Sequence, residues 1–519
     1  MTMHGAAGPW ERAQAALNRR DLREARAALE AVLQHEPAHV PARVLLAGVH
    51  LGERRLRDAS SQLLQAARAL PDDAATVCRV AQALMRVGES AATHDVLQHP
   101  SIGSCRDGVI LASLAHVHQS LGQHEHALAL MDRARTLRFD NPDFRYFRSI
   151  QLQFNGRLDE AREELESCLR LGPTYGRASL TLARLRKATA ASNQLAYIDE
   201  QLRRVAPGTE DHAAFEFARY KELEDLGDYA AAFEALARGN AIMHARVQHD
   251  PARDARHIDA LIARCTPSFF AQPAEEADDD GPQPIFIVGL PRSGTTVLDR
   301  ILGNHSQAMS AGELGDFAHQ LRWAADLPGR TLLDDALIER LPSLDFADIG
   351  RRYLAQTRWR AGDRRFYVDK LPPNFLVAGL IARALPRARI LHLHRDAMDV
   401  CFSNWRALFG DAYGYSYDLQ ALAMHHRHYR RLMAHWHAVL PGRILDVDYG
   451  ELVSHPDAVA ERVFAFCGLP MEAGVTDLSR NAAPVATLSS AQVREGIHGR
   501  GIAEWMRYES QLQPLHDAL

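Results

Sequence analysis

The chain has 519 residues, which is long enough for two to four domains. With 47% hydrophobic and 24% charged residues, its composition is ordinary for a water-soluble globular protein. The 60 Lys and Arg residues against 65 Asp and Glu residues give a net charge of -5, which argues against a nucleic-acid partner and against a polybasic membrane anchor.

The cysteines and the apolar runs indicate the compartment. Six cysteines are scattered without a Cys-x-x-Cys pair, which is typical of a reducing compartment and offers no ligand set for structural zinc. The first residues lack a basic flank followed by an apolar core, and no run of about 18 apolar residues occurs. We therefore expect a cytoplasmic protein without a membrane segment.

A repeat with a period of 34 residues organises the first half of the chain. Gly88, Gly122 and Gly156 follow this spacing, and Arg54 and Arg20 occupy the two preceding equivalent positions. A small residue follows five positions after most of these turns, at Ala25, Ala59, Ala127 and Ala161. Because a small side chain lets two antiparallel helices approach closely, the pattern predicts helix pairs that turn at the glycine or arginine.

This pattern resembles the tetratricopeptide repeat, a helix-turn-helix unit, over roughly residues 6–207. A further helix pair around Gly227 and Ala232 extends the expected TPR-like domain to residues 1–245. The resemblance implies a concave surface that binds a peptide or a partner protein. An equally weighted interpretation is that the repeats only support the second half of the chain or form a homodimer.

Residues 246–283 are expected to hold a connecting helix and an acidic, Pro-rich linker. Residues 271–284 include three prolines and five acidic residues, a composition that does not form a core. Beyond the linker, the pattern changes from all-helical to alternating strands and helices. The predicted fold is an all-α TPR-like solenoid followed by an α/β, P-loop-like domain with a central parallel sheet.

The stretch PIFIVGLPRSGTTVLDRIL predicts a strand, a loop and a helix. Backbone amides and the positive end of the helix dipole converge at such a junction, which therefore suits a phosphate. The spacing from Gly289 to Gly294 nearly copies a nucleotide P-loop, but Thr295 takes the place of its lysine. This disfavours a kinase that uses a Mg-nucleoside triphosphate, while Arg292 offers a planar fork for an anionic group.

Three further strands are predicted at residues 365–370, 389–395 and 443–449, with a helix at 374–385. This alternation implies a parallel sheet whose ligands bind at the carboxyl ends of the strands. Arg395 ends one of these strands and Ser403 lies two helical turns further, so both can reach one phosphate.

The LPRSGTT segment and the RDAMDVCFS segment together resemble the sulfotransferases over about residues 284–515. The closest resemblance is to tyrosylprotein sulfotransferases and to bacterial proteins that join tetratricopeptide repeats to such a domain. In this family the first segment holds the 5'-phosphosulfate of 3'-phosphoadenosine 5'-phosphosulfate (PAPS), and the second holds its 3'-phosphate. Ala397 replaces the usual proline of the second segment.

Three more segments carry the resemblance. SAGELGDF places Glu313 at the position of the family's catalytic base, and VDKLPPNF places Lys370 where a lysine contacts the phosphosulfate. TLSSAQVR matches a C-terminal signature in which Ser489 lies near the donor. Glu504 stands where members often carry a lysine, so Arg500 or Arg494 is expected to supply that charge.

The resemblance implies a PAPS-dependent sulfotransferase domain at residues 284–519 that needs no metal. The expected acceptor is a hydroxyl, first a tyrosine of a protein or peptide, with a glycan or small molecule as the rival. A scaffold whose domain binds nucleotide without turnover is the other alternative. The expected catalytic residues are Glu313, Lys370 and Arg292. The expected donor-binding residues are Pro291, Arg292, Ser293, Gly294, Thr295, Thr296, Arg395, Ser403, Tyr449, Ser489 and Arg500.

Histidine clusters do not predict a metal site. His392 and His394 alternate along a strand, and His425, His426 and His428 share a helix. A chain with 26 histidines is expected to contain such clusters by chance, and no nearby carboxylate or cysteine completes a ligand set in the sequence.

Overall fold

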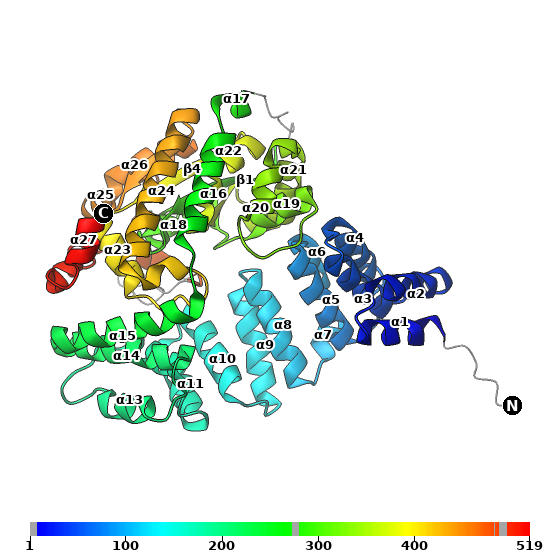
Figure 1. Ribbon diagram of the computed structural model, residues 1–519, viewed down its shortest axis with the longest axis horizontal. Helices are drawn as coiled ribbons and strands as arrows, with labels where there is room; N and C mark the ends of the chain where they lie inside the picture. The colour runs from blue at the N-terminus through cyan, green and yellow to red at the C-terminus, as the bar shows by residue number, and fades with distance from the viewer. Residues whose placement is uncertain (1–7, 272–279, 482, 487–495) are drawn as a thin grey trace. The chain divides into compact units, whose positions relative to one another are not determined.

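A computed structural model describes residues 8–271, 280–481, 483–486 and 496–519 (Figure 1). These residues form two compact units. The first contains residues 8–139 and 314–360, and the second contains the remaining described residues. Each unit therefore combines repeat helices with segments from the second half of the chain. Most of the predicted acidic linker, residues 272–279, lies outside the described residues.

The N-terminal part of the first unit is a succession of helices. They are α1 (Pro9–Asn18), α2 (Leu22–His35), α3 (Val40–Gly52), α4 (Leu56–Ala67), α5 (Ala74–Val87), α6 (Ser90–Val96), α7 (Ser101–Ser104), α8 (Gly108–Ser120) and α9 (His124–Thr136). The second unit continues the series with α10 (Pro142–Phe154), α11 (Leu158–Leu171), α12 (Gly176–Leu185), α13 (Leu195–Leu202), α14 (Glu210–Leu226), α15 (Tyr229–Val247), α16 (Pro251–Arg264) and α17 (Pro267–Phe270).

The turn positions of the predicted repeat share one backbone conformation. Arg20, Arg54, Gly88, Gly122 and Gly156 have positive φ angles of 59°, 61°, 81°, 77° and 78°. The alanines at the predicted close approaches, Ala25, Ala59, Ala127 and Ala161, are fully buried. The period of the repeat is thereby confirmed.

Helices α19 (Asp316–Ala325), α20 (Asp335–Arg340) and α21 (Phe346–Thr357) complete the first unit. They contact the repeats through the buried carboxylate of Glu89. Glu89 accepts hydrogen bonds from Ser60 Oγ at 2.5 Å, Arg352 Nη2 at 2.9 Å and Gln356 Nε2 at 2.8 Å. Because a buried carboxylate is costly without partners, these bonds tie residues 314–360 to the first repeats.

A five-stranded parallel sheet forms the centre of the second unit. Its strands are β1 (Gln283–Gly289), β2 (Ala308–Ser310), β3 (Phe366–Lys370), β4 (Arg389–His394) and β5 (Ile444–Asp448), in the order β2-β3-β1-β4-β5. Four of the strands and their parallel direction confirm the prediction. The three-residue strand β2 was not predicted.

The helices of the sheet domain are α18 (Thr295–Gly303), α22 (Ala378–Ala384), α23 (Ala397–Trp405), α24 (Leu419–Val439), α25 (Tyr449–Ser454), α26 (Pro456–Cys467) and α27 (Gln513–Ala518). Short 3-10 turns lie at Leu341–Ser343, Arg358–Ala361, Pro372–Val377, Gly414–Tyr417, Leu478–Arg480 and Glu504–Tyr508. The helix predicted at 374–385 therefore begins as a 3-10 turn, since Pro372 and Pro373 open it without backbone donors.

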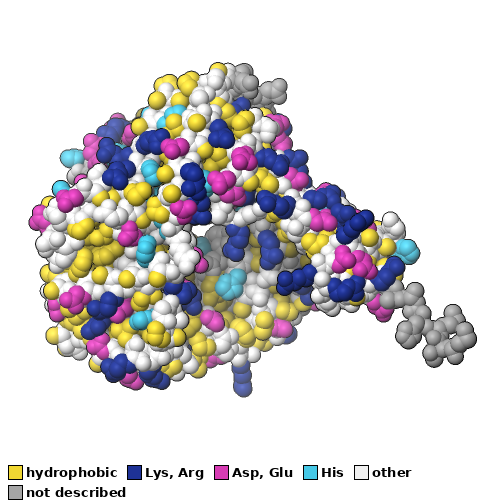
Figure 2. Space-filling model, viewed as in Figure 1, with side chains coloured by type: hydrophobic (Ala, Val, Ile, Leu, Met, Phe, Trp, Pro, Cys, Tyr) yellow, Lys and Arg dark blue, Asp and Glu magenta, His cyan; other side chains and the backbone are white. Residues whose placement is uncertain are grey.

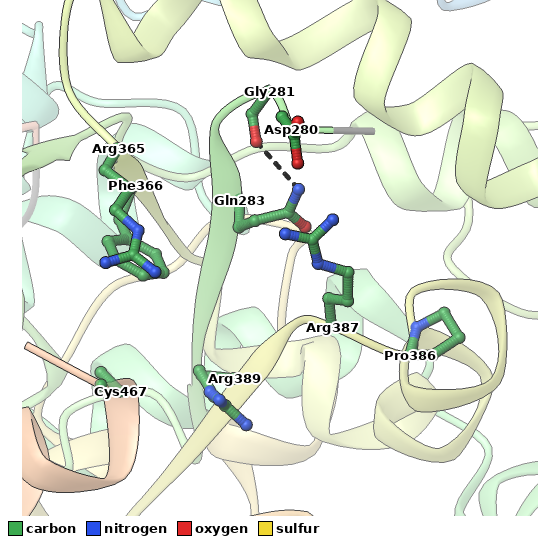
Figure 3. A pocket seen from close by; sticks show the side chains of 10 residues that line it. Asp280, Gly281, Gln283, Arg365, Phe366, Pro386, Arg387, Arg389 and Cys467 are labelled. Atoms are coloured by element: carbon green, nitrogen blue, oxygen red, sulfur yellow. Dashed lines mark hydrogen bonds between the residues drawn. The ribbon is translucent and has the colours of Figure 1, made fainter. Parts of the chain in front are cut away.

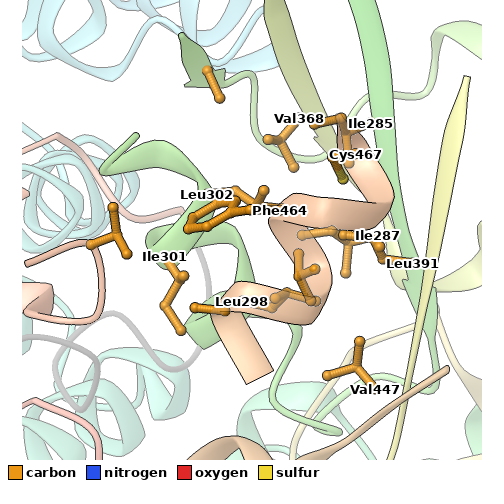
Figure 4. Close-up of a cluster of buried hydrophobic side chains, with 14 of the residues drawn as sticks. Ile285, Ile287, Leu298, Ile301, Leu302, Val368, Leu391, Val447, Phe464 and Cys467 are labelled. Atoms are coloured by element: carbon orange, nitrogen blue, oxygen red, sulfur yellow. The ribbon is translucent and has the colours of Figure 1, made fainter. Parts of the chain in front are cut away.

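Apolar side chains from α18 and α26 cover one face of the sheet (Figure 4). Leu298 and Ile301 from α18, and Phe464 from α26, lie in one buried cluster with Ile287 and Leu391 of the central strands. The opposite face is covered by α24 and by the segment around α22, where Trp436 donates a hydrogen bond to the carbonyl of Phe375 at 2.9 Å. The sheet is thus held between two helical layers.

Figure 2 shows one face of the molecule, on which both basic and acidic side chains occur. Among the described helices, none is both long and apolar enough to cross a bilayer. The six cysteines are buried and unpaired.

Candidate active site

The loop between β1 and α18 lies where the sequence predicts an anion site. Gly289 ends β1, and a Cβ atom there would lie 2.3 Å from the carbonyl oxygen of Leu393 on β4, so glycine is required by the close approach of the strands. Gly294 precedes α18 and offers no capping side chain to its first amides. Ser293 is buried, and its hydroxyl has no hydrogen-bond partner among the described residues. The loop therefore presents polar groups suited to a bound anion.

Two left-handed residues shape this loop. Arg292 has φ 66° and Gly294 has φ 105°. A Cβ atom on Gly294 would lie 2.3 Å from the ring of Tyr449, so the tyrosine covers the loop directly. The left-handed conformation of Arg292 is uncommon outside glycine, and together with that of Gly294 it gives the loop its sharp turns.

Arg395 is fixed at the adjacent carboxyl end of β4. Its guanidinium donates to the carbonyl of Arg292 at 3.2 Å and to the carbonyl of Gly501, and lies 4.7 Å from the ring centre of Tyr449. Asp399 approaches it at 3.9 Å. Two carbonyls, a carboxylate and a ring thus orient one largely buried guanidinium group beside the loop.

Several guanidinium groups gather around the loop. Burial, and after it the charges of Arg406, Arg184 and Arg395, lower the pKa of Arg292 to about 9. Arg406 is paired with Glu504, the acid that stands where the sequence resemblance implies a lysine. Because like charges destabilise one another, an anionic ligand among these groups would be favoured.

Lys370 and Glu313 meet at the carboxyl end of β3. Lys370 is buried, and its Nζ donates to Glu313 Oε1 at 2.5 Å, while its backbone amide donates to the carbonyl of Gly312 at 2.9 Å. Lys370 lies beside Ile287 of β1 in the sheet register, two residues before that strand ends. The structure thus brings together the predicted base and the predicted lysine next to the loop between β1 and α18, which we call the anion loop.

A second acid lies near this pair. Burial raises the pKa of Asp299 on α18 above its usual value, and the neighbouring charge of Lys370 offsets only part of this rise. Ser310 donates a hydrogen bond to Asp299 Oδ2 at 3.0 Å. On the other side, burial and then the Glu313 carboxylate raise the pKa of Tyr413. Neither Asp299 nor Tyr413 was among the predicted site residues.

The other predicted residues have different placements. Pro291, Thr295 and Thr296 belong to the loop and the start of α18 and are largely buried. Ser403 is buried on α23. Arg500 is exposed, one residue before the Gly501 carbonyl that binds Arg395. Ser489 lies outside the described residues.

Asn404 contacts the loop between β1 and α18, and the sequence did not predict this contact. Its side-chain amide donates to the carbonyl of Pro291 at 2.7 Å and to the carbonyl of Val400 at 2.8 Å. It therefore joins α23 to the anion loop. Its position, next to Ser403 in the RDAMDVCFS segment, was the only available hint.

Repeat helices of the second unit contact the same helix. The side chain of Asn240 on α15 donates to the carbonyl of Trp405 at 3.1 Å, and the ring of Phe233 lies 5.1 Å from that of Trp405. Near the C-terminus, Tyr508 donates to Glu224 on α14 at 3.1 Å. Repeat helices α14 and α15 therefore support the helix that carries Ser403 and Asn404.

A pocket at the other end of the sheet differs from this site (Figure 3). Its volume is about 290 Å³, and it is lined by the amino-terminal residues of three strands, including Gln283, Phe366 and Arg389, with Arg365 and Arg387 beside them. Ligands of parallel α/β sheets bind at the carboxyl ends of the strands. We therefore assign the candidate active site to the carboxyl ends and not to this pocket.

Two parts of the chain match known protein families. Residues 284–473 match the family model described as Sulfotransferase family, and residues 10–77 match that of the tetratricopeptide repeat. An uncharacterized protein of Aquifex aeolicus is 30% identical over 375 residues, which cover 70% of this chain and 48% of that protein. The TPR repeat-containing thioredoxin TTL4 of Arabidopsis thaliana is 44% identical over 64 residues, covering 12% of this chain and 9% of that protein.

Among solved structures, the sulfotransferase domain of the Synechococcus PCC 7002 olefin synthase is 21% identical, with a TM-score of 0.33. The match covers 45% of this chain and 91% of that domain. The chain spans about half the length of the Aquifex relative and under a tenth of the Arabidopsis one. The fold is a TPR-like helical region followed by an α/β domain of the sulfotransferase type with a central parallel sheet.

Proposed function

We propose that residues 284–519 form a PAPS-dependent sulfotransferase that moves a sulfuryl group to an acceptor hydroxyl. The observation that carries the proposal is the Lys370–Glu313 pair, 2.5 Å apart, at the carboxyl end of the strand next to the anion loop. An acid-base pair beside an anion site is the arrangement that group transfer to a hydroxyl requires. The match of residues 284–473 to the sulfotransferase family supports the same reaction class.

The donor would lie across the ends of β1 and β4. The loop amides, Ser293 and the start of α18 would bind the 5'-phosphosulfate, while Arg395, with Ser403, would bind the 3'-phosphate. Tyr449 is the proposed neighbour of the adenine. Arg292 would place a positive charge beside the phosphosulfate. The other guanidinium groups near Arg292 also favour an anion at this place. Ser489 and Arg500 stay candidates for the outer part of the donor site.

In the proposed reaction, the acceptor oxygen attacks sulfur and the bond from sulfur to the bridging phosphate oxygen breaks. Glu313 takes the acceptor proton, and Lys370 stabilises the negative charge that develops on the leaving phosphate. The products are a sulfate ester and adenosine 3',5'-bisphosphate. Before the donor binds, the ion pair holds both side chains at the site, and the arriving sulfonate would compete with Glu313 for Lys370.

The acceptor is proposed to be a tyrosine of a protein or peptide, with a glycan or small-molecule hydroxyl as the rival. The contacts of Asn240 and Phe233 with Trp405 support a bracing role for the second-unit repeats. The Glu89 contacts support the same role for the first repeats toward residues 314–360. A partner or acceptor bound by the repeats would be an additional role.

Incubation of the full chain with labelled PAPS and three acceptor types, a tyrosine peptide, an oligosaccharide and a simple phenol, tests the proposal. We expect label on at least one acceptor together with release of adenosine 3',5'-bisphosphate, and loss of both with Lys370→Ala. Nucleotide binding without transfer to any acceptor would favour the inactive scaffold. Tighter binding of Mg-ATP than of adenosine 3',5'-bisphosphate would overturn the donor assignment.

A further inference from the structure

Three side chains from β4, β5 and α24 converge on one point. His392 on β4 and Asp446 on β5 are direct neighbours in the strand register, and His437 lies near the end of α24, which turns back into β5. His392 Nδ1 lies 2.6 Å and His437 Nε2 lies 2.9 Å from the same oxygen, Oδ1 of Asp446. The three ligand atoms all lie within 4.8 Å of one another.

We propose that His392, His437 and Asp446 bind a divalent transition-metal ion of the zinc class. Two imidazoles and one carboxylate are a ligand set that zinc prefers, and they are not the all-oxygen set of Mg²⁺ or Ca²⁺. Ligand atoms around a tetrahedral zinc ion are about 3.4 Å apart, as follows from bond lengths near 2.1 Å. The observed separations therefore need only small side-chain movements to admit the ion.

The second ring nitrogen of His392, Nε2, has the hydrogen-bond partner that a metal-bound histidine needs. His392 Nε2 is hydrogen-bonded to the hydroxyl of Tyr429 on α24. When Nδ1 holds a metal, Nε2 carries the proton and donates it to that hydroxyl, which fixes the tautomer and the orientation of the ring. The tyrosine is thus a positioning residue for the first ligand.

The site is closed on one side and open on the other. The His392 side chain is 7% exposed, whereas those of His437 and Asp446 are 35% and 48% exposed. An ion can therefore enter from solvent and keep a water molecule in its fourth position. Because the ligands come from β4, β5 and α24, the bound ion would join the edge strand of the sheet to its neighbour and to the covering helix.

The same three groups also make a complete hydrogen-bond network without an ion. Asp446 can accept from both imidazoles, and Tyr429 can donate to His392. That network predicts no uptake of metal, whereas the proposed site predicts one ion per chain. Metal binding by the full chain therefore separates the two interpretations.

The experiment titrates Co²⁺ into untagged full-length protein stripped with a chelator, and follows the visible absorption of bound cobalt and the thermal midpoint. We expect one Co²⁺ per chain, displaced by Zn²⁺ but not by a large excess of Mg²⁺, with a higher midpoint in the bound form. His437→Ala and Asp446→Asn should each weaken cobalt binding at least about tenfold. Tyr429→Phe should weaken it about tenfold, since loss of such a partner costs roughly 10-fold to 100-fold in metal affinity.

His428→Ala is the matched control, because His428 lies on the same helix as His437 but outside the cluster. It should bind cobalt as the unchanged chain does. The proposal is overturned if the unchanged chain takes up no stoichiometric cobalt. It is equally overturned if His428→Ala and His437→Ala lose binding alike. These outcomes do not depend on sulfotransferase activity.

Discussion

The two ends of the parallel sheet both carry arginines, but they hold them differently. At the carboxyl end, the Arg395 guanidinium is largely buried and bound to two backbone carbonyls. At the amino end, Arg365 and Arg389 are exposed and lie 5.1 Å and 5.9 Å from the ring centres of Phe366 and Phe466. The number of cations therefore does not identify an anion site. An anion site is identified by a guanidinium that the backbone orients, because a fixed donor loses little entropy when the ligand binds.

The largest effect should come from the acid at the carboxyl end. Glu313→Gln keeps the shape of the side chain but removes the proton acceptor, so turnover should fall by about 10² to 10⁴ while donor affinity hardly changes. Steady-state kinetics with PAPS and binding of adenosine 3',5'-bisphosphate by calorimetry measure the two quantities. Asp280→Asn, the same chemical change in the amino-end pocket, should leave both unchanged. Near-normal turnover of Glu313→Gln would make Glu313 a bystander.

A paired arginine substitution sharpens the comparison further. Arg395→Ala should raise the dissociation constant for adenosine 3',5'-bisphosphate about tenfold to a hundredfold, because a charged hydrogen bond contributes roughly 1.5 to 3 kcal/mol. Arg389→Ala removes an arginine from the other end of the same strand and should change donor binding by less than about twofold. Equal losses in the two variants would mean that general charge, not orientation, controls binding.

The smallest effect compares two glycines with positive φ. Gly294→Ala places a Cβ 2.3 Å from Tyr449, whereas Gly442→Ala, in the turn before β5, meets nothing within 4 Å. Both substitutions strain the backbone, so the overlap with Tyr449 should make Gly294→Ala less stable by roughly a further 1 to 3 kcal/mol, as is typical of overpacking. Chemical denaturation measures the difference. Equal losses of stability would show that the ring of Tyr449 moves aside without cost.

Local patterns were sufficient for much of the fold. The apolar runs located β1, β3, β4 and β5, and the 34-residue period located turns whose residues are all left-handed. Strand β2 escaped because Ala308–Ser310 is too short to carry an alternating pattern. The domain boundaries proposed at residues 245 and 284 stay predictions. The two compact units follow a different division, because each of them combines segments from both halves of the chain.

The site was less accessible to sequence reasoning. Motif positions predicted that Glu313 and Lys370 belong to one site. No sequence motif links His392 to Asp446, because Asp446 lies 54 residues away on the next strand. The absence of a nearby carboxylate in the sequence was therefore no guide to the cluster in space. Asn404 was missed for a related reason, because its partner is a backbone carbonyl in a loop 113 residues earlier.

The Glu89 contacts have a consequence for synthesis in the cell. Arg352, which covers this carboxylate, follows it by 263 residues, so at about 5 to 20 residues per second it leaves the ribosome roughly 10 to 50 seconds later. During that interval the nascent repeats display a face that is buried in the finished protein. We expect a pause in translation between the two segments to lower the yield of folded chain.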